Sequence, residues 1–301
     1  MRRSYAVWRA FWSDRRAAVA AVFLLVEIAL VLFLPLFLGQ DPNLTDRSAG
    51  FWAAPSAQHW LGTDDVGRDL FARLLYGGRT SLLVGFASAA LGVILGVVVA
   101  LIRVTWDKTC LEIRGPRRIV LAIANFAAKV YLTVIRGTPV IVQLLILYYV
   151  VFASSRNKLL VGALSFGINS GAYVAEIIRS GIMSIDPGQM EAGRSLGFGY
   201  VATMRHIILP QAFKNVLPAL CNEFIALLKE TSVSGFIALQ DLTRGADIIR
   251  SRTYNVVLPL FTVALVYWMI VTFLTYMVGK LPLIASANTV NKNLGSSFIA
   301  L

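Results

Sequence analysis

Histidine, cysteine and acidic residues are scarce in this sequence. Its 301 residues include two histidines, two cysteines, and 16 aspartates and glutamates. Cys110 and Cys221 lie far apart, and with His59 and His206 they form no recognisable metal-ligand spacing. Neither a disulfide framework nor a metal site is therefore expected. No nucleophile or catalytic dyad stands out either, so an enzymatic role is poorly supported and no catalytic residue is assigned.

A nucleotide-binding loop is also missing. The pattern G-x-x-x-x-G-K-[ST], whose backbone amides cradle phosphates, occurs nowhere in the chain. No cofactor is therefore expected in this chain, and energy from ATP would have to come from another subunit.

Charged residues make up only 15% of the chain, whereas hydrophobic residues make up 57%. This composition differs from that of an average soluble domain and is typical of a protein in a bilayer. The net charge of +12 would favour nucleic-acid binding in a soluble protein. Here the basic residues cluster at the ends of apolar runs, as in residues 1–16, so membrane topology explains them better and no nucleic-acid partner is expected.

Long apolar runs indicate an all-α integral membrane protein with about six transmembrane helices. A hydrocarbon core of about 30 Å needs about 20 helical residues. The expected spans cover about residues 17–38, 80–102, 139–152, 160–183, 216–239 and 256–278. The first is interpreted as a retained anchor, because it is long for a signal peptide and no small-residue cleavage site follows it. The basic clusters place both termini in the cytoplasm.

These spans divide the chain into three parts. Residues 1–79 are expected to form an anchor helix and a polar external segment, and residues 80–280 a transmembrane core. Residues 281–301 then form a cytoplasmic tail.

The apolar region of residues 119–152 is too long for one helix and is broken at Arg136-Gly137-Thr138-Pro139. Proline removes a backbone donor and disfavours helical geometry at the preceding residue. We expect a helix along the cytoplasmic interface up to about residue 135, followed by a short span. The break is either a gating hinge, with Arg136 anchored at the interface, or simply the start of a helix.

Glycines recur at a spacing of four in two of the expected spans. Gly92 with Gly96, and Gly167 with Gly171, would let helices approach closely. Alternatively, these pairs reflect only the general frequency of glycine in membrane helices.

A polar stretch of about 30 residues separates the spans that end near 183 and begin near 216. It predicts one short helix over residues 189–196, ended by Gly197 and Gly199, and a second over residues 200–208. Leu209-Pro210 is expected to reset the chain direction before the next span. Such a compact cytoplasmic unit suits docking to a partner that moves the helices.

The spacing in this stretch resembles the EAA motif in the membrane subunits of type I ABC importers. The matching positions are Glu191, Ala192, Gly193, Gly197, Ile207, Leu209 and Pro210. In that family the helix with the glutamate is the coupling helix, which sits in a cleft of the ATP-binding subunit. Gly193 departs from the usual alanine and is expected to loosen the helix by about 0.5–1 kcal/mol. Arg194 and Arg205 either add contacts to that subunit or are solvated.

Three further stretches, residues 131–149, 171–197 and 209–242, resemble the polar-amino-acid permeases of the histidine, glutamine and arginine type. The amino-terminal part instead resembles dipeptide and oligopeptide permease subunits, through "DPNLTD" and "HWLGTDDVGRDLFARLLYGGRTSLLVG". The chain therefore combines features that resemble two different permease families. A polar amino acid is the expected cargo, and a di- or oligopeptide is the alternative.

The resemblance implies a type I importer fold in a bacterial inner membrane, and it implies several partners. Two permease chains, identical or homologous, would form the path, and two ATP-binding subunits would bind ATP and Mg²⁺. An extracytoplasmic binding protein would deliver the solute. A rival interpretation is an ion-coupled carrier working alone, but that predicts inverted repeats, which are not visible, and leaves the cytoplasmic unit without a purpose.

Ionisable residues at membrane depth are costly and therefore candidates for function. Glu176 lies one helical turn from Arg179 and can pair with it. Lys229-Glu230-Thr231-Ser232 interrupts an apolar run, and interrupted helices expose backbone groups to solutes. The candidates for the substrate path or gate are Arg136, Thr138, Pro139, Glu176, Glu223, Lys229 and Thr231. The alternative is that the charges pair with each other or with a second subunit and only stabilise the packing.

Overall fold

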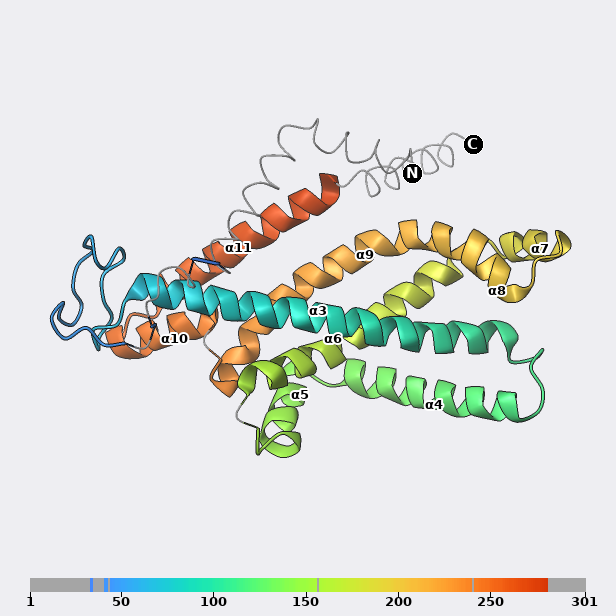
Figure 1. Ribbon diagram of the computed structural model, residues 1–301, viewed down its shortest axis with the longest axis horizontal. Helices are drawn as coiled ribbons and strands as arrows, with labels where there is room; N and C mark the ends of the chain where they lie inside the picture. The colour runs from blue at the N-terminus through green and yellow to red at the C-terminus, as the bar shows by residue number, and fades with distance from the viewer. Residues whose placement is uncertain (1–32, 35–40, 43, 156, 240, 281–301) are drawn as a thin grey trace.

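The computed structural model describes residues 33–34, 41–42, 44–155, 157–239 and 241–280. Regular structure in these residues is entirely helical (Figure 1). The helices are α3 (Leu70–Thr109), α4 (Pro116–Gly137), α5 (Val140–Ile146), the π-helix η1 (Leu147–Val151), α6 (Lys158–Met183), α7 (Pro187–Ser195), α8 (Tyr200–Thr203), the π-helix η2 (Met204–Ile208), α9 (Leu209–Glu230), the 3-10 helix η3 (Thr231–Ile237), α10 (Leu242–Thr253) and α11 (Val257–Lys280). The expected first span, apart from residues 33–34, and the expected cytoplasmic tail lie outside the described residues.

Four of these helices, α3, α4, α6 and α11, are long and apolar enough to cross a membrane. The expectation of an all-helical membrane protein is therefore confirmed. The helix α9 has 22 residues but carries four charged side chains, and it is not among the four. It ends as a regular α-helix at Glu230 and continues as η3, so the predicted interruption near residues 229–232 is present.

The helix α3 begins about ten residues before the expected span. Asp69 caps it, because its carboxylate accepts a hydrogen bond from the Ala72 amide at 2.7 Å. With 40 residues, α3 extends about 60 Å, roughly twice the thickness of the hydrocarbon core. It runs across residue 79, and the division of the chain at that position stays a prediction.

The helix α4 covers the segment that was expected to lie along the cytoplasmic interface. Its 22 residues satisfy the length and composition of a span, and it runs alongside α3 (Figure 1). The interfacial position of α4 stays a prediction, because its length and composition also fit a span. The predicted break is confirmed: α4 ends at Gly137, Thr138 is extended, and α5 begins after Pro139.

The glycine pairs pack α3 closely against α6. A Cβ on Gly92 would lie 3.2 Å from the Ser170 side chain, and a Cβ on Gly96 would overlap that of Val174. A Cβ on Gly167 would overlap Leu91 in the same way. The expected close approach is therefore present at both pairs, and α6 is the most buried helix of the bundle.

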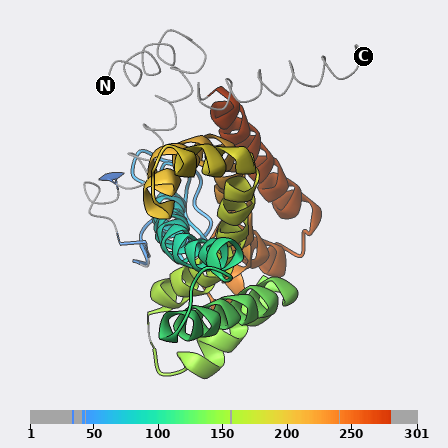
Figure 2. The same ribbon diagram turned by 90° about the vertical axis from the view of Figure 1, so that its right-hand side faces the viewer.

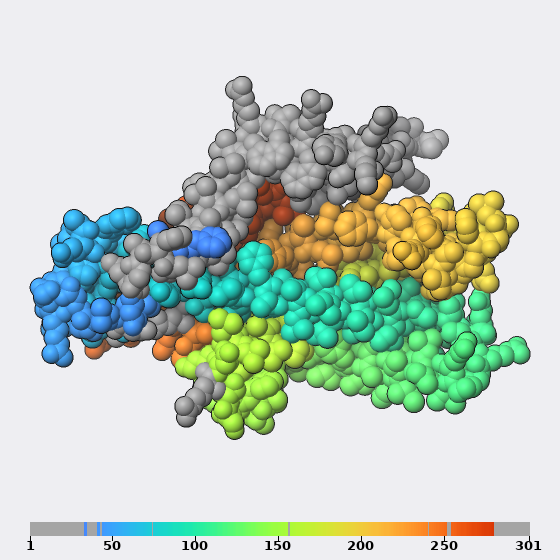
Figure 3. All heavy atoms as spheres, in the orientation of Figure 1, coloured from blue at the N-terminus to red at the C-terminus, as the bar shows by residue number. Residues whose placement is uncertain are grey.

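The two ends of the bundle carry different structures (Figure 3). The irregular segment of residues 44–69 covers one end, and α7 and α8 lie at the other. Figure 2 turns this second end toward the viewer, where α7 and α8 lie beside the link between α3 and α4. The elements that the sequence predicts to be cytoplasmic and external therefore lie at opposite ends of the bundle.

The segment of residues 44–69 is folded onto the start of α3. The His59 ring lies between two carboxylates, with Nδ1 2.8 Å from Asp69 Oδ2 and Nε2 3.3 Å from Asp46 Oδ2. Asp64 accepts hydrogen bonds from the Arg68 side chain and from Arg73 of α3. These contacts tie the segment to the residue that caps α3.

Candidate functional site

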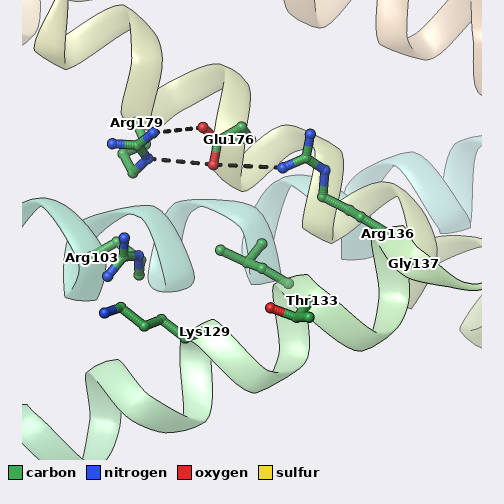
Figure 4. Close-up of a pocket in the computed structure, with 8 residues that line it drawn as sticks. Arg103, Lys129, Thr133, Arg136, Gly137, Glu176 and Arg179 are labelled. Atoms are coloured by element: carbon green, nitrogen blue, oxygen red, sulfur yellow. Dashed lines mark hydrogen bonds and ion pairs between the residues drawn. The ribbon is translucent and has the colours of Figure 1, made fainter.

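A cavity of about 500 Å³ opens between α3, α4 and α6 (Figure 4). Ligand sites in proteins commonly have volumes of roughly 300–1,000 Å³. The lining residues are Arg103, Lys129, Leu132, Thr133, Arg136, Gly137, Glu176 and Arg179. Four cationic side chains from three helices thus surround one glutamate, so most of the charged groups in the wall are positive.

Glu176 lies at the centre of this charge cluster. Its Oε1 lies 2.7 Å from Arg179 Nη2, and its Oε2 lies 3.8 Å from Arg136 Nη1. The predicted pairing of Glu176 with Arg179 is therefore present, and Arg136 joins it. The Arg136 guanidinium also lies 5.7 Å from the ring centroid of Tyr173, a distance typical of a cation–π contact.

A second acid balances the far side of the cluster. Asp107 lies 3.7 Å from Arg179 and 3.9 Å from Arg103. Figure 4 shows Lys129 next to Arg103 on the same side of the cavity. Against four cations, the two carboxylates leave an excess of positive charge, which favours an anionic group of a ligand.

The other candidate path residues lie away from this cavity. Glu223 on α9 accepts a hydrogen bond from the Ser170 hydroxyl at 3.0 Å. Lys229 is exposed near the end of α9, and the buried Thr231 hydroxyl donates to Leu228 O. Thr138 and Pro139 are exposed at the break after Arg136. Glu223, Lys229 and Thr231 therefore belong to a separate part of the bundle.

Several cavity residues were not identified from the sequence. Arg103 in the wall and Asp107 beside it were not selected, because their grouping with Arg179 depends on how the helices pack. Lys129 is different, because it stands inside the apolar run of residues 119–135. The cost of a charge at membrane depth was a sufficient signal to select it.

The expected pair of short helices is present at the opposite end. Asp186 caps α7 by accepting from the Gly188 amide at 2.8 Å, and Pro187 occupies the first turn. Gly197 ends the helix at φ 85°, a conformation that favours glycine. Glu191 and Ala192 are exposed on α7, and Glu191 forms no ion pair with the residues that the structure describes.

The helix is not broken at Leu209-Pro210, where the chain direction was expected to be reset. The helix continues from α8 through the π-turn η2 into α9, with Leu209 in right-handed helical geometry. Pro210 lacks the amide that would bond one turn back, and the wider π-turn directly before it accommodates this loss.

An apolar cluster anchors the α7–α8 unit to the spans. Val104 of α3, Ile182 of α6, and Ile208 and Ala212 form its buried core, and Ile207 packs against it. Gly193 is buried under Thr203 and Ile207. Motion of α7 is therefore linked by packing to the ends of α3 and α6, the helices that line the cavity.

Comparisons with known proteins identify the family and the fold of this chain. The family described as "Binding-protein-dependent transport system inner membrane component" matches residues 121–281, more than half of the chain. This chain belongs to that family. As a family member with four apolar helices of spanning length, it is a multi-pass membrane transport subunit.

Two curated relatives of this transport subunit come from Bacillus subtilis (strain 168). Its arginine transport system permease protein is 37% identical over 210 residues, which cover 69% of this chain and 89% of the relative. Its L-cystine transport system permease protein is 33% identical over 239 residues, covering 78% and 91%.

Solved structures show the same membrane fold. An amino acid ABC transporter solved with histidines matches with 39% identity and a TM-score of 0.60, covering 69% of this chain and 92% of that chain. The MetNI methionine ABC transporter matches with a TM-score of 0.56 at 20% identity, over 70% and 95%, which supports the fold alone. The expected importer fold is therefore confirmed. The resemblance of residues 1–79 to peptide permeases stays a prediction.

Proposed function

We propose that the chain is the membrane subunit of an ATP-driven, binding-protein-dependent importer of a polar amino acid. The observation that carries this proposal is the cavity in which Arg103, Lys129 and Arg136 stand around Glu176. The names of the relatives, which include arginine and L-cystine permeases, support the same class of cargo.

An amino acid needs one partner for its carboxylate and another for its ammonium group. The excess cations of the cavity suit the carboxylate, and Glu176 suits the ammonium group. Glu176 is already held by Arg136 and Arg179, so an entering solute exchanges ion pairs instead of meeting an unpaired charge. Such an exchange avoids the large cost of isolating a charge at membrane depth.

Coupling to a motor would use the opposite end of the chain. Exposed Glu191 on α7 suits contact with an ATP-binding subunit, which would bind ATP and Mg²⁺. The cluster around Val104 and Ile182 joins α7 to α3 and α6. Glu176 is seven residues before the end of α6, a distance of about 10 Å, so a shift of that helix would reach the cavity.

The assembly would contain two permease chains, two ATP-binding subunits and an extracytoplasmic binding protein. In this arrangement the α7–α8 unit faces the cytoplasm, residues 44–69 face outward, and both termini are cytoplasmic. A carrier working alone would leave the exposed, anchored α7 without a partner, which disfavours that alternative.

The test is ATP hydrolysis by this chain reconstituted with its candidate ATPase and binding protein. We expect one polar amino acid from a panel of amino acids and short peptides to stimulate hydrolysis. Stimulation by peptides alone would contradict the proposed cargo and favour the peptide-permease resemblance of residues 1–79. An ATPase that neither bound nor responded would contradict the proposed coupling.

A further inference from the structure

Gln143 connects both sides of the break between α4 and α5. Its amide nitrogen lies 2.8 Å from Ile135 O, 3.0 Å from Thr138 O and 2.7 Å from Thr138 Oγ1. The Thr138 hydroxyl itself donates to Val134 O, which leaves its oxygen free to accept from Gln143. One buried amide therefore satisfies carbonyls on either side of Arg136.

The same glutamine binds α6. Gln143 Oε1 accepts a hydrogen bond from Asn169 Nδ2 at 2.9 Å, and Asn169 is only 3% exposed. A buried amide pair of this kind is expensive to disrupt, because each partner left unpaired loses its hydrogen bond without access to water. The α4–α5 break is thus attached to α6 by a specific polar contact.

Arg136 is attached to the same face of α6. Asn169, Tyr173 and Glu176 are four and three residues apart, so they line one side of that helix. Gln143 contacts the first of them, whereas Arg136 lies over the second and pairs with the third. The contacts close a ring from α6 through Gln143 and the break to Arg136 and back to α6.

We propose that Gln143 is a positioning residue, which acts with Asn169 to hold the backbone around Arg136 so that the Arg136 guanidinium stays at the cavity. In this arrangement the break is not a free hinge, and the end of α4 moves together with α6. The transport part of this inference rests on the proposed function, whereas its structural part does not.

The functional test is a double-mutant cycle in the reconstituted complex. Gln143→Met keeps the size of the side chain and removes its hydrogen bonds. We expect the solute concentration for half-maximal ATPase stimulation to rise about tenfold, with the maximal rate nearly unchanged, as for Arg136→Ala. In the Arg136→Ala background, Gln143→Met should add almost nothing, because Gln143 acts through that arginine.

Ser165→Ala is the matched control, since it removes a buried hydroxyl of α6 that donates a hydrogen bond to Val161 O of its own helix. It should leave the half-maximal concentration within about twofold of the parent. Effects of Gln143→Met and Arg136→Ala that multiply would overturn the positioning role. An unchanged half-maximal concentration for Gln143→Met would overturn it as well.

A second measurement is independent of transport. Amide hydrogen exchange over residues 135–143 in the intact complex should accelerate about tenfold or more in Gln143→Met and in Asn169→Leu, but not in Ser165→Ala. Unchanged exchange in both variants would refute the proposed restraint. If no amino acid stimulated even the parent complex, the proposed function would fail, while the exchange data would still decide whether Gln143 restrains the break.

Discussion

Gly193 packs against Thr203 so closely that a Cβ on the glycine would lie 2.5 Å from Thr203 Cγ2. The glycine is buried between α7 and α8, and its carbonyl accepts a hydrogen bond from the Phe198 amide at 3.1 Å. The glycine therefore permits a contact between the two short helices that alanine would obstruct.

Gly193→Ala should loosen the α7–α8 unit. Alanine improves helix propensity by about 0.5–1 kcal/mol, but overpacking a fitted contact costs about 1–3 kcal/mol, so the net effect is destabilising. We expect faster proteolysis of residues 187–208 and weaker binding of the ATPase. Thr203→Ser removes the obstructing methyl group and should partly restore both.

A suitable control for this variant is Gly245→Ala in α10, where a Cβ would meet no atom within 4 Å. It should leave proteolysis unchanged or slower. An equal increase of proteolysis in Gly193→Ala and Gly245→Ala would show that the Thr203 contact does not cause the loosening.

Gly193 also illustrates the limits of sequence reasoning for this chain. The residue was expected only to loosen its helix, because the position of Thr203 depends on the fold. The contact of Glu176 with Arg179 was predictable, since residues three apart on a helix are neighbours. Gln143 and Asn169, which are 26 residues apart, meet only because α5 packs on α6, and no local pattern indicates that packing.

Glu191→Ala should abolish transport and solute-stimulated ATP hydrolysis while the fold is retained. The residue is exposed, so its removal leaves no cavity and costs little stability. The measurement is stimulated hydrolysis together with thermal unfolding of the complex. Glu112→Ala is the matched control, because that acid is also exposed and its pair with Arg194 is worth only about 0–1 kcal/mol. Normal coupling in Glu191→Ala would remove the basis for assigning α7 to the motor interface.

Glu176→Gln should weaken solute binding about ten- to hundredfold, because the neutral amide cannot neutralise Arg136 or an incoming ammonium group. The measurement is the solute concentration at half-maximal transport. Glu223→Gln tests the competing path, since Glu223 lies on α9 and bonds to Ser170 outside the cavity. If Glu223→Gln raised the half-maximal solute concentration more than Glu176→Gln, the solute path would be assigned to α9.

The His59 contacts predict a pH dependence of the external segment. The hydrogen bond to Asp69 raises the pKa of His59 above its usual 6.5, and Asp46 contributes in the same direction against the effect of burial. Hydrogen bonds from the Ser48 hydroxyl and amide lower the pKa of Asp46 to about 2, so this carboxylate stays charged. His59 is therefore the group of this pair that titrates near neutral pH.

Because the folded-state pKa of His59 is raised, its stabilising contribution is complete below about 6.5 and is lost as the pH rises through the raised value. We expect the protection of the amides in residues 44–69 from hydrogen exchange, relative to an unstructured chain, to fall over that interval. In His59→Gln the protection of these amides should be low at every pH, whereas His206→Gln, at the opposite end of the bundle, should keep the pH dependence of the parent. Protection that does not change with pH in the parent would mean that the ring binds Asp69 equally well without its second proton. The attachment of this segment to the start of α3 would then not depend on the charge of His59.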